Sequence, residues 1–339
     1  MTARVLPVSP DAPDPTVLRQ AAAILRAGGL VAFPTETVYG LGANALDADA
    51  VRRIFEAKGR PSFNPVIAHV ADAEGARALV RAWPPLAEAL AARFWPGPLT
   101  LVLPRRPEVP DVVTAGRDGV AVRVPAHPVA RALIAEAGIP LAAPSANRFT
   151  HLSPVTAAHV VRALGDRVDL ILDGGRTDVG IESTVVDLTT DPPTLLRPGT
   201  IPRQALEAVT GPLAAPAAPD HEDAPRAAPG MIARHYAPRA QVRLVDAAAF
   251  GAALREAIAA GGRVGALTWS TAPRREVAVS GAAFHRELPA DALGYAAALY
   301  EALHAADDAG CASVVIEMVP ARAAWDGVRD RLTRAAHQG

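Results

Sequence analysis

The sequence is poor in cysteine and in aromatic residues. Its 339 residues include one cysteine, Cys311, which excludes an intrachain disulfide framework and a metal site built from several cysteines. Aromatic residues make up only 4% of the chain, which counts against a stacking platform for single-stranded nucleic acid. The formal net charge is -1, so no overall basic field attracts a polyanion.

Long apolar runs are also missing. No stretch of about 18 apolar residues occurs without a charge, so we expect no membrane span. Residues 1–15 lack the apolar core that a secretory signal peptide carries. The sparse cysteine fits a reducing compartment. We therefore expect a cytoplasmic protein.

Lysine and asparagine are the scarcest polar residues. Of the 34 lysines and arginines, Lys58 is the single lysine, which leaves 34 − 1 = 33 arginines. Asparagine occurs only at Asn44, Asn64 and Asn147. Such a bias is typical of a GC-rich coding background that uses arginine wherever either cation serves. A lysine retained there, unless by chance, marks a site that needs a compact ammonium rather than a wide guanidinium.

Short apolar runs separated by polar loops predict an α/β fold over the first part of the chain. We expect residues 1–210 to form one domain, a twisted mixed sheet flanked by helices. The predicted strands cover residues 30–33, 66–70, 100–103, 120–124, 169–172, 184–188 and 194–197. The predicted helices cover residues 49–57, 73–81, 85–94, 128–136, 154–164 and 202–209.

The rest of the chain divides into a linker and a smaller domain. Residues 211–239 begin with a stretch of proline and alanine that has linker composition and end with the more specific string RHYAP. Residues 240–339 alternate between strand and helix patterns, which predicts a small Rossmann-like parallel α/β domain. Its predicted strands cover residues 242–245, 264–268 and 313–317, and its predicted helices cover residues 247–260, 291–308 and 323–336.

Two common nucleotide motifs and a common zinc motif do not explain this sequence. It has no Walker-type GxxxxGK[ST] motif and no histidine pair with HxxxH spacing. Residues 40–45 (GLGANA) match GxGxxA, but residues 34–39 separate them from the preceding strand. A dinucleotide-binding loop follows its strand directly, so a Rossmann site here is the weaker alternative.

Four cationic side chains lie at the predicted ends of helices or strands. Lys58 and Arg60 follow a predicted helix, where a solvated helix end is the plain alternative. Arg123 and Arg197 lie in apolar strands, and a buried arginine needs a carboxylate of the protein or of a ligand. Together these side chains predict a small anionic, phosphorylated ligand.

Hydroxyl and amide groups gather in two loops, PTETVYGLG at residues 34–42 and APSAN at residues 143–147. Such groups either bind a ligand or merely bond to their own turn. Ser153-Pro154 has the pattern of a helix N-cap with proline at the first helical position, where free N–H groups also favour phosphate. No nucleophile set of the Ser/His/Asp or Cys/His kind is evident, so these residues alone do not identify the reaction.

Together these segments resemble the YrdC-like threonylcarbamoyl-adenylate synthases in their long, two-domain form. The matching strings are PTETVYGLG, KGRP with a downstream NP, WPGPLTLVL, VAVRVP, APSAN, IESTVVDL, LRPG and RHYAP, in family order across residues 28–240. The resemblance implies a nucleotidyltransferase that converts ATP, L-threonine and bicarbonate to threonylcarbamoyl-AMP and pyrophosphate. A separate tRNA threonylcarbamoyl transferase assembly would then modify the adenosine next to the anticodon.

The resemblance also assigns roles to residues. Lys58 and Arg60 would be catalytic and grip the triphosphate. The implied ATP-binding residues are Arg60, Asn64, Gly119, Ser145, Asn147, Ser153, Arg197 and Tyr236. The implied threonine-binding residues are Thr37, His69, Arg123, Ala143 and Ser183, with Thr35 and Tyr39 as second choices. Mg²⁺ would arrive with ATP and need few protein ligands, and residues 211–239 would cover the site as a lid.

The sequence departs from the family at Gly119, where threonine is common, and at Ile232-Ala233, where more polar or aromatic residues are common.

Two other functions compete with the synthase. An RNA-binding module of YrdC type would bind RNA in a salt-dependent way without its own adenylation activity, and direct contact with tRNA stays open. Carbamoyl-adenylate formation, as in hydrogenase-maturation carbamoyltransferases, would come with cysteine-rich zinc modules that one cysteine cannot build.

Overall fold

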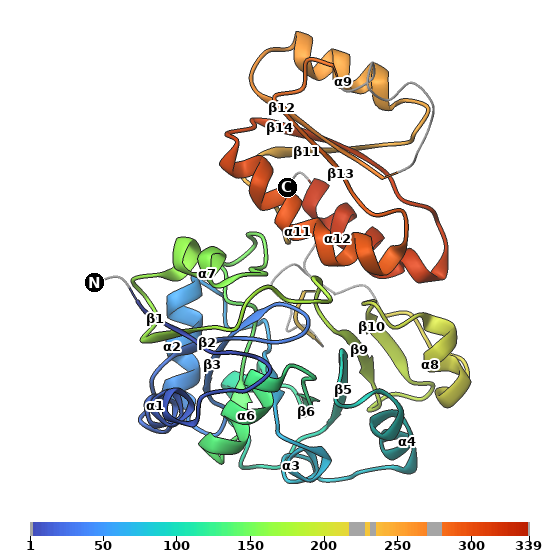
Figure 1. Cartoon of the computed structure of the whole chain (residues 1–339). Helices are drawn as coiled ribbons and strands as arrows, with labels where there is room; N and C mark the ends of the chain where they lie inside the picture. The colour runs from blue at the N-terminus through green and yellow to red at the C-terminus, as the bar shows by residue number, and fades with distance from the viewer. Residues whose placement is uncertain (1–2, 217–227, 231–234, 270–279, 338–339) are drawn as a thin grey trace.

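The computed structural model describes residues 3–216, 228–230, 235–269 and 280–337. Two sheets dominate these residues, a larger one in the N-terminal unit and a smaller one in the C-terminal unit (Figure 1). Within the described part of the chain, no helix is both long enough and apolar enough to cross a membrane. The proposed boundaries at residues 210 and 239 stay a prediction.

The N-terminal unit has a mixed sheet with ten strands among the described residues, in the order β1-β8-β2-β3-β7-β4-β6-β5-β9-β10. Parallel pairs such as β4 with β6 alternate with antiparallel pairs such as β5 with β6, as the sequence predicts. The strands are β1 (Arg4–Pro7), β2 (Val31–Pro34), β3 (Tyr39–Asn44), β4 (Ile67–His69), β5 (Leu99–Pro104), β6 (Gly119–Arg123), β7 (Leu141–Ala142), β8 (Leu170–Asp173), β9 (Thr184–Asp187) and β10 (Thr194–Arg197).

Helices flank this sheet, and one of them places Lys58. Asp47 caps α2 by accepting hydrogen bonds from the amides of Asp49 and Ala50, and Gly59 ends the helix in a left-handed conformation with φ 63°. Lys58 is therefore the last residue of the helix. The helices of this unit are α1 (Pro15–Arg26), α2 (Ala48–Lys58), α3 (Ala73–Arg77), α4 (Pro85–Phe94), α5 (Asp111–Thr114), α6 (Pro128–Ala137), α7 (Ala157–Leu164) and α8 (Arg203–Thr210).

The C-terminal unit has a parallel sheet of four strands in its described residues, in the order β11-β14-β12-β13. Helices α11 and α12 cover the face toward the N-terminal unit, and α9 lies on the far side (Figure 1). This is the small parallel α/β fold that the sequence predicts. The elements are β11 (Gln241–Val245), α9 (Phe250–Ala259), β12 (Val264–Thr268), β13 (Phe284–Glu287), α11 (Ala292–Asp308), β14 (Ser313–Glu317), a 3-10 turn (Ala323–Trp325) and α12 (Asp326–Ala336).

The two units share an apolar core. Val38, Leu152 and Ile181 of the N-terminal unit belong to the same buried cluster as Tyr300 and Leu303 of α11. Backbone atoms also approach closely, because a Cβ on Gly180 would lie 2.5 Å from backbone atoms of α11. The contact surface between the units is therefore packed like a protein interior.

Several sequence predictions need correction. Residues 34–42 do not form one loop, because residues 39–44 form β3 and pair antiparallel with β2. The GxGxxA match therefore lies mostly in a strand, which rules out a dinucleotide loop there. Helix α7 begins at Ala157 rather than Pro154, and its N-cap is Thr156, not Ser153. The sequence reading also missed β1, α1, α5 and β13, and it extended α3 beyond its observed end.

Candidate functional site

One cavity in the N-terminal unit gathers residues from segments that are far apart in the sequence. The ends of β2, β4, β6 and β10 converge on it, together with the loops before β9 and after β7 and part of the segment before β11. It holds about 490 Å³ of space between atoms, part of which is open to solvent. The lining residues are Thr35, Thr37, Val38, Gly40, Arg60, Ile67, His69, Arg123, Ala143, Pro144, Ser145, Glu182, Ser183, Arg197, Pro229, Gly230, His235 and Tyr236.

The cavity brings together most of the residues that the sequence singles out. All five implied threonine-binding residues line it, and so do several of the implied ATP-binding residues. The predicted residues in the lining are Thr35, Thr37, Arg60, His69, Arg123, Ala143, Ser145, Ser183, Arg197 and Tyr236. A single shared site is therefore a property of the folded chain.

Lys58 lies directly behind this lining. Its buried ammonium donates hydrogen bonds to the backbone carbonyls of Ser145 and Asn147. Burial and the charge of Arg60 lower the pKa of Lys58 well below its usual value, whereas the charge of Glu182 raises it. Lys58 thus fixes the loop that follows β7.

The side chains of Asn147 and Asn64 also lie behind the lining. The Asn147 amide donates to the carbonyls of Arg148 and His151 at 2.8 Å each, so it shapes the same loop as Lys58. The Asn64 amide is fully buried, and neither of its polar atoms has a hydrogen-bond partner among the described residues. Such an unsatisfied pair of polar atoms favours a partner such as a ligand or a water molecule.

Arg60 supplies one cation of the lining. Its guanidinium donates to the carbonyls of Asn64 (3.1 Å) and Pro65 (2.7 Å). Burial is the main cause that lowers the pKa of Arg60 to about 9, and Arg197 lowers it further. At neutral pH the guanidinium remains charged in a poorly solvated position, where an anion is a suitable partner.

A second group of lining residues surrounds Arg123. Its Nη2 lies 2.7 Å from the carboxylate of Glu36 and donates to the Thr37 hydroxyl at 3.0 Å. Burial, followed by the charge of Arg123, lowers the pKa of His69 to about 3, so the imidazole is neutral at pH 7. The sequence reading missed Glu36, although its place between two threonines of the PTET string marks it.

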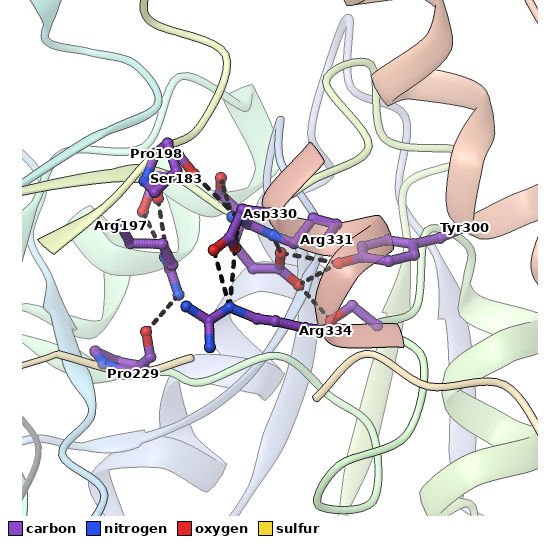
Figure 2. Close-up of polar contacts among 10 residues, drawn as sticks. Ser183, Arg197, Pro198, Pro229, Tyr300, Asp330, Arg331 and Arg334 are labelled. Atoms are coloured by element: carbon purple, nitrogen blue, oxygen red, sulfur yellow. Dashed lines mark hydrogen bonds and ion pairs between the residues drawn. The ribbon is translucent and has the colours of Figure 1, made fainter. Parts of the chain in front are cut away.

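Arg197 organises the part of the wall that lies near Arg331 of the C-terminal unit (Figure 2). Its guanidinium donates to the Ser183 carbonyl (3.0 Å), the Ser183 hydroxyl (3.2 Å) and the Pro229 carbonyl (2.9 Å). Ser183 is hydrogen-bonded in turn to the Thr100 hydroxyl at 2.8 Å. This chain of contacts ties the ends of β10 and β5 to the segment at residues 228–230.

Glu182 connects the cavity to the C-terminal unit. Its carboxylate accepts hydrogen bonds from Arg331 (2.7 Å), Tyr300 (3.1 Å) and Ser153 (2.5 Å). Burial raises the pKa of Glu182, but the charges of Arg331 and Arg197 and the hydrogen bonds from Ser153 and Arg331 outweigh burial and hold it below its usual value. The sequence reading missed Glu182, which lies in the IESTVVDL string, and its partners on α11 and α12.

The segment before β11 forms part of the wall. Tyr236 is only 1% exposed and has a positive φ of 59°. Its hydroxyl lies so close to Gly230 that a Cβ on this glycine would come within 2.1 Å. The predicted lid at residues 211–239 includes residues 217–227 and 231–234, which lie outside the described residues, as do Ile232, Ala233 and the arginine of RHYAP.

Three further predicted residues also lie outside the lining. Ser153 is fully buried and bonds to Glu182. Gly119 lies at the end of β6 opposite Arg123, where it pairs with Pro104. The Tyr39 hydroxyl donates to the Gly175 carbonyl at 2.6 Å, and burial raises its pKa. The proposed contacts of these three residues with ligands stay predictions. Ser153 contacts the cavity lining through its hydrogen bond to Glu182.

Comparisons with known proteins identify the family. A family model described as "Telomere recombination" matches residues 23–199, and one described as "Threonylcarbamoyl-AMP synthase, C-terminal domain" matches residues 201–337. The threonylcarbamoyl-AMP synthase of Pyrococcus abyssi is 54% identical over 230 residues, which is 68% of each chain. That of Bacillus subtilis is 42% identical over 328 residues, which cover 95% of this chain and 93% of the relative.

The fold has a counterpart among solved structures. P. abyssi Sua5 complexed with L-threonine matches with a TM-score of 0.90 and 41% sequence identity, over 98% of this chain and 97% of that chain. The match includes both units. The chain therefore belongs to the threonylcarbamoyl-AMP synthase family, in the two-domain form that carries the additional C-terminal domain.

Proposed function

We propose that this protein is an L-threonylcarbamoyladenylate synthase, a nucleotidyltransferase that uses ATP, L-threonine and bicarbonate. One observation carries the proposal: a single cavity holds the cations Arg60 and Arg197 together with the polar group around Arg123. The first pair suits the phosphates of a nucleotide, and the second group suits an amino acid. The threonine complex of the solved relative supports this assignment.

The Arg123 group forms the amino-acid side of the proposed site. The guanidinium of Arg123 is suited to the α-carboxylate of threonine, and the Thr37 hydroxyl lies beside it. His69 is neutral, so it offers a hydrogen bond without adding charge. A cavity that is partly closed to solvent also helps to protect the N-carboxylated amino acid, which loses CO2 readily in water.

The Arg60 and Arg197 side forms the nucleotide part of the site. The threonine amine and bicarbonate first give N-carboxythreonine, with loss of water. The new carboxylate then attacks the α-phosphorus of ATP. A new oxygen–phosphorus bond forms, the bond to the β-phosphate oxygen breaks, and pyrophosphate leaves with its electron pair. The cations neutralise charge on the phosphates, and Lys58 keeps the loop bearing Ser145 in place. Holding both reactants together supplies up to about 7–11 kcal/mol through effective molarity.

Mg²⁺ belongs to this proposal as the partner of ATP. Among the described residues, no group of three or more His, Cys, Asp or Glu side chains could hold a metal ion. Glu182, the acidic side chain of the described lining, is engaged by Arg331. The described residues therefore fit a Mg²⁺ ion whose ligands come mostly from the triphosphate and water.

The proposal extends to the product. Threonylcarbamoyl-AMP would pass to a tRNA threonylcarbamoyl transferase assembly in the cytoplasm. The alternative of an RNA-binding module without adenylation activity has less support, because full-length relatives bear the name of the synthase. Direct contact with tRNA is left to experiment.

The test is to incubate the protein with Mg·ATP, bicarbonate and each amino acid in turn, and to measure pyrophosphate. We expect threonine-dependent and bicarbonate-dependent release, with threonylcarbamoyl-AMP identified by mass spectrometry. Equal release with serine or glycine would contradict threonine specificity. RNA binding without any threonine-dependent release would instead favour the RNA-binding module.

A further inference from the structure

Glu182 is a carboxylate in the wall of a cavity whose lining also carries the cations Arg60, Arg123 and Arg197. Within the described lining, it is the one acidic side chain, and it lies next to Ser183, which Arg197 contacts. An uncompensated carboxylate there would repel a triphosphate and would attract Arg197 away from it. Its charge therefore has to be neutralised by something other than the nucleotide-binding cations.

The C-terminal unit supplies that neutralisation. Arg331 of α12 has a completely buried side chain whose Nε donates to the Glu182 carboxylate at 2.7 Å (Figure 2). The same guanidinium donates to the carbonyls of Pro198 (3.0 Å) and Glu182 (3.2 Å). Tyr300 of α11 donates a further hydrogen bond to the carboxylate. Neither Arg331 nor Tyr300 is part of the described lining, so these contacts hold Glu182 from outside the cavity.

The neighbouring charges leave Arg331 available for this task. Asp330 also contacts Arg331, at 2.6 Å, but Asp330 is shared with Arg334, whose Nε lies 3.0 Å away. The four side chains Glu182, Asp330, Arg331 and Arg334 therefore balance one another. Arg197 donates its hydrogen bonds to neutral acceptors, and the charge of Glu182 acts on it without a direct ion pair among the described residues.

We propose that Arg331 is a positioning residue for the nucleotide: it neutralises and holds Glu182, so that Arg60 and Arg197 face the triphosphate without a competing carboxylate. This assigns a role to the C-terminal unit, which completes the electrostatics of a site whose lining lies elsewhere in the chain. The inference rests on the proposed function for its ligand, ATP.

The test compares Arg331→Met, Arg331→Lys, Glu182→Gln and the double variant Arg331→Met/Glu182→Gln in the full-length chain. Binding of Mg²⁺ with a non-hydrolysable ATP analogue is measured by calorimetry, and KM values are measured from pyrophosphate release. We expect Arg331→Met to weaken analogue binding and raise KM for ATP at least about tenfold, with KM for threonine changed by less than about twofold.

The double variant separates charge from packing. It lacks the Arg331 contacts to Pro198 and to the Tyr236 ring (5.1 Å), but it has no carboxylate left to neutralise. We expect it to bind the analogue within about threefold of the wild type, a recovery that additive effects would not give. Arg331→Lys keeps the charge and is expected to retain most of the affinity.

A matched control breaks another ion pair between the units. Arg162 of α7 pairs with Asp308 of α11 at a partly exposed position away from Glu182. Arg162→Ala should leave analogue binding and both KM values unchanged.

Three results would overturn the proposal: a folded Arg331→Met variant with wild-type affinity, equal losses for ATP and threonine, or a double variant as weak as the single one. If Arg331→Met does not fold, the double variant and Arg331→Lys test the proposal, because it requires both proteins to bind the ATP analogue. Calorimetry measures binding of the ATP analogue even if neither the wild type nor any variant shows threonine-dependent activity. Such a lack of activity would contradict the proposed function and not the role of Arg331.

Discussion

Arg123 and Glu36 form a buried ion pair at the wall of the cavity, with 2.7 Å between Nη2 and Oε1. The side chains are only 4% and 9% exposed. The contact does not have hydrogen-bond geometry, and neither Glu36 oxygen has a hydrogen-bond partner in the described part of the chain. Arg123 therefore holds a protein carboxylate while it remains next to the Thr37 hydroxyl, on the side where the substrate carboxylate is expected.

Arg123→Ala should affect both activity and stability. We expect kcat/KM for threonine to fall at least about tenfold, or about 1.4 kcal/mol, because the substrate carboxylate loses its cation. The free energy of unfolding should fall by about 3–5 kcal/mol, because Glu36 is left buried and unpaired. Pyrophosphate release and denaturant unfolding measure the two effects.

The double variant Arg123→Ala/Glu36→Gln is the control for that experiment. It removes the unpaired charge, so we expect most of the lost stability to return while the threonine defect remains. Recovery of both together would mean that Arg123 serves only to neutralise Glu36. Full activity in Arg123→Ala would remove this residue from the substrate site.

We expect activity to require the compact ammonium of Lys58 and not only its positive charge. Its ammonium donates to two carbonyls that belong to the loop bearing Ser145 and Asn147. A guanidinium is wider and planar, so Lys58→Arg should displace the loop, and Lys58→Ala should leave the carbonyls unpaired. We expect pyrophosphate release to fall at least about tenfold in both variants. Wild-type rates in Lys58→Arg would show that charge alone is sufficient.

His69 should make stability depend on pH. The folded protein keeps it neutral down to about pH 3, since that is where burial places the pKa of His69, whereas an unfolded chain protonates histidine near pH 6.5. The unfolded state therefore binds more protons below pH 6.5, and stability falls as pH drops toward 3. Between pH 7.5 and pH 5 the loss from this residue should be about 2 kcal/mol.

Denaturant unfolding of the wild type and of His69→Asn at both pH values measures that contribution. Other buried histidines, such as His235, also have a lowered pKa, so the difference between the two proteins isolates His69. Asparagine keeps an N–H donor near the Ile67 carbonyl, which His69 contacts at 3.2 Å. An identical pH dependence in both proteins would contradict the assignment.

The local parts of the structure could be predicted from sequence because local chemistry determines them. Asp47 and Gly59 mark the two ends of α2 and so place Lys58. Strand β3 was missed because its glycines are typical of a loop, and only pairing with β2 makes it a strand. Ser153-Pro154 was read as a helix start, but Glu182, far along the chain, engages the Ser153 hydroxyl.

The cavity was predicted in part for the same reason. Thr37, His69 and Arg123 belong to specific strings and were found, whereas the contact between Glu182 and Arg331 joins residues 149 positions apart. No periodicity or motif links those two positions. Their pairing is set by how α12 packs on the N-terminal unit, which a single sequence does not reveal.

Gly327 tests that packing. It lies in the first turn of α12, and a Cβ there would come within 2.3 Å of the Gly199 carbonyl oxygen, a backbone atom that cannot turn aside. Alanine stabilises a helix by up to about 1 kcal/mol relative to glycine. We nevertheless expect Gly327→Ala to lower the free energy of unfolding by about 1–3 kcal/mol, because α12 has to move outward.

The same movement of α12 should draw Arg331, one turn further along the helix, away from Glu182. We therefore expect Gly327→Ala to raise KM for ATP, as we also expect for Arg331→Met. Thr333→Ala, at an exposed position of the same helix, controls for helix propensity and should leave both stability and KM nearly unchanged. A Gly327→Ala protein that is more stable than the wild type would show that α12 does not rest on Gly199. The structural basis for placing Arg331 against Glu182 would then be lost.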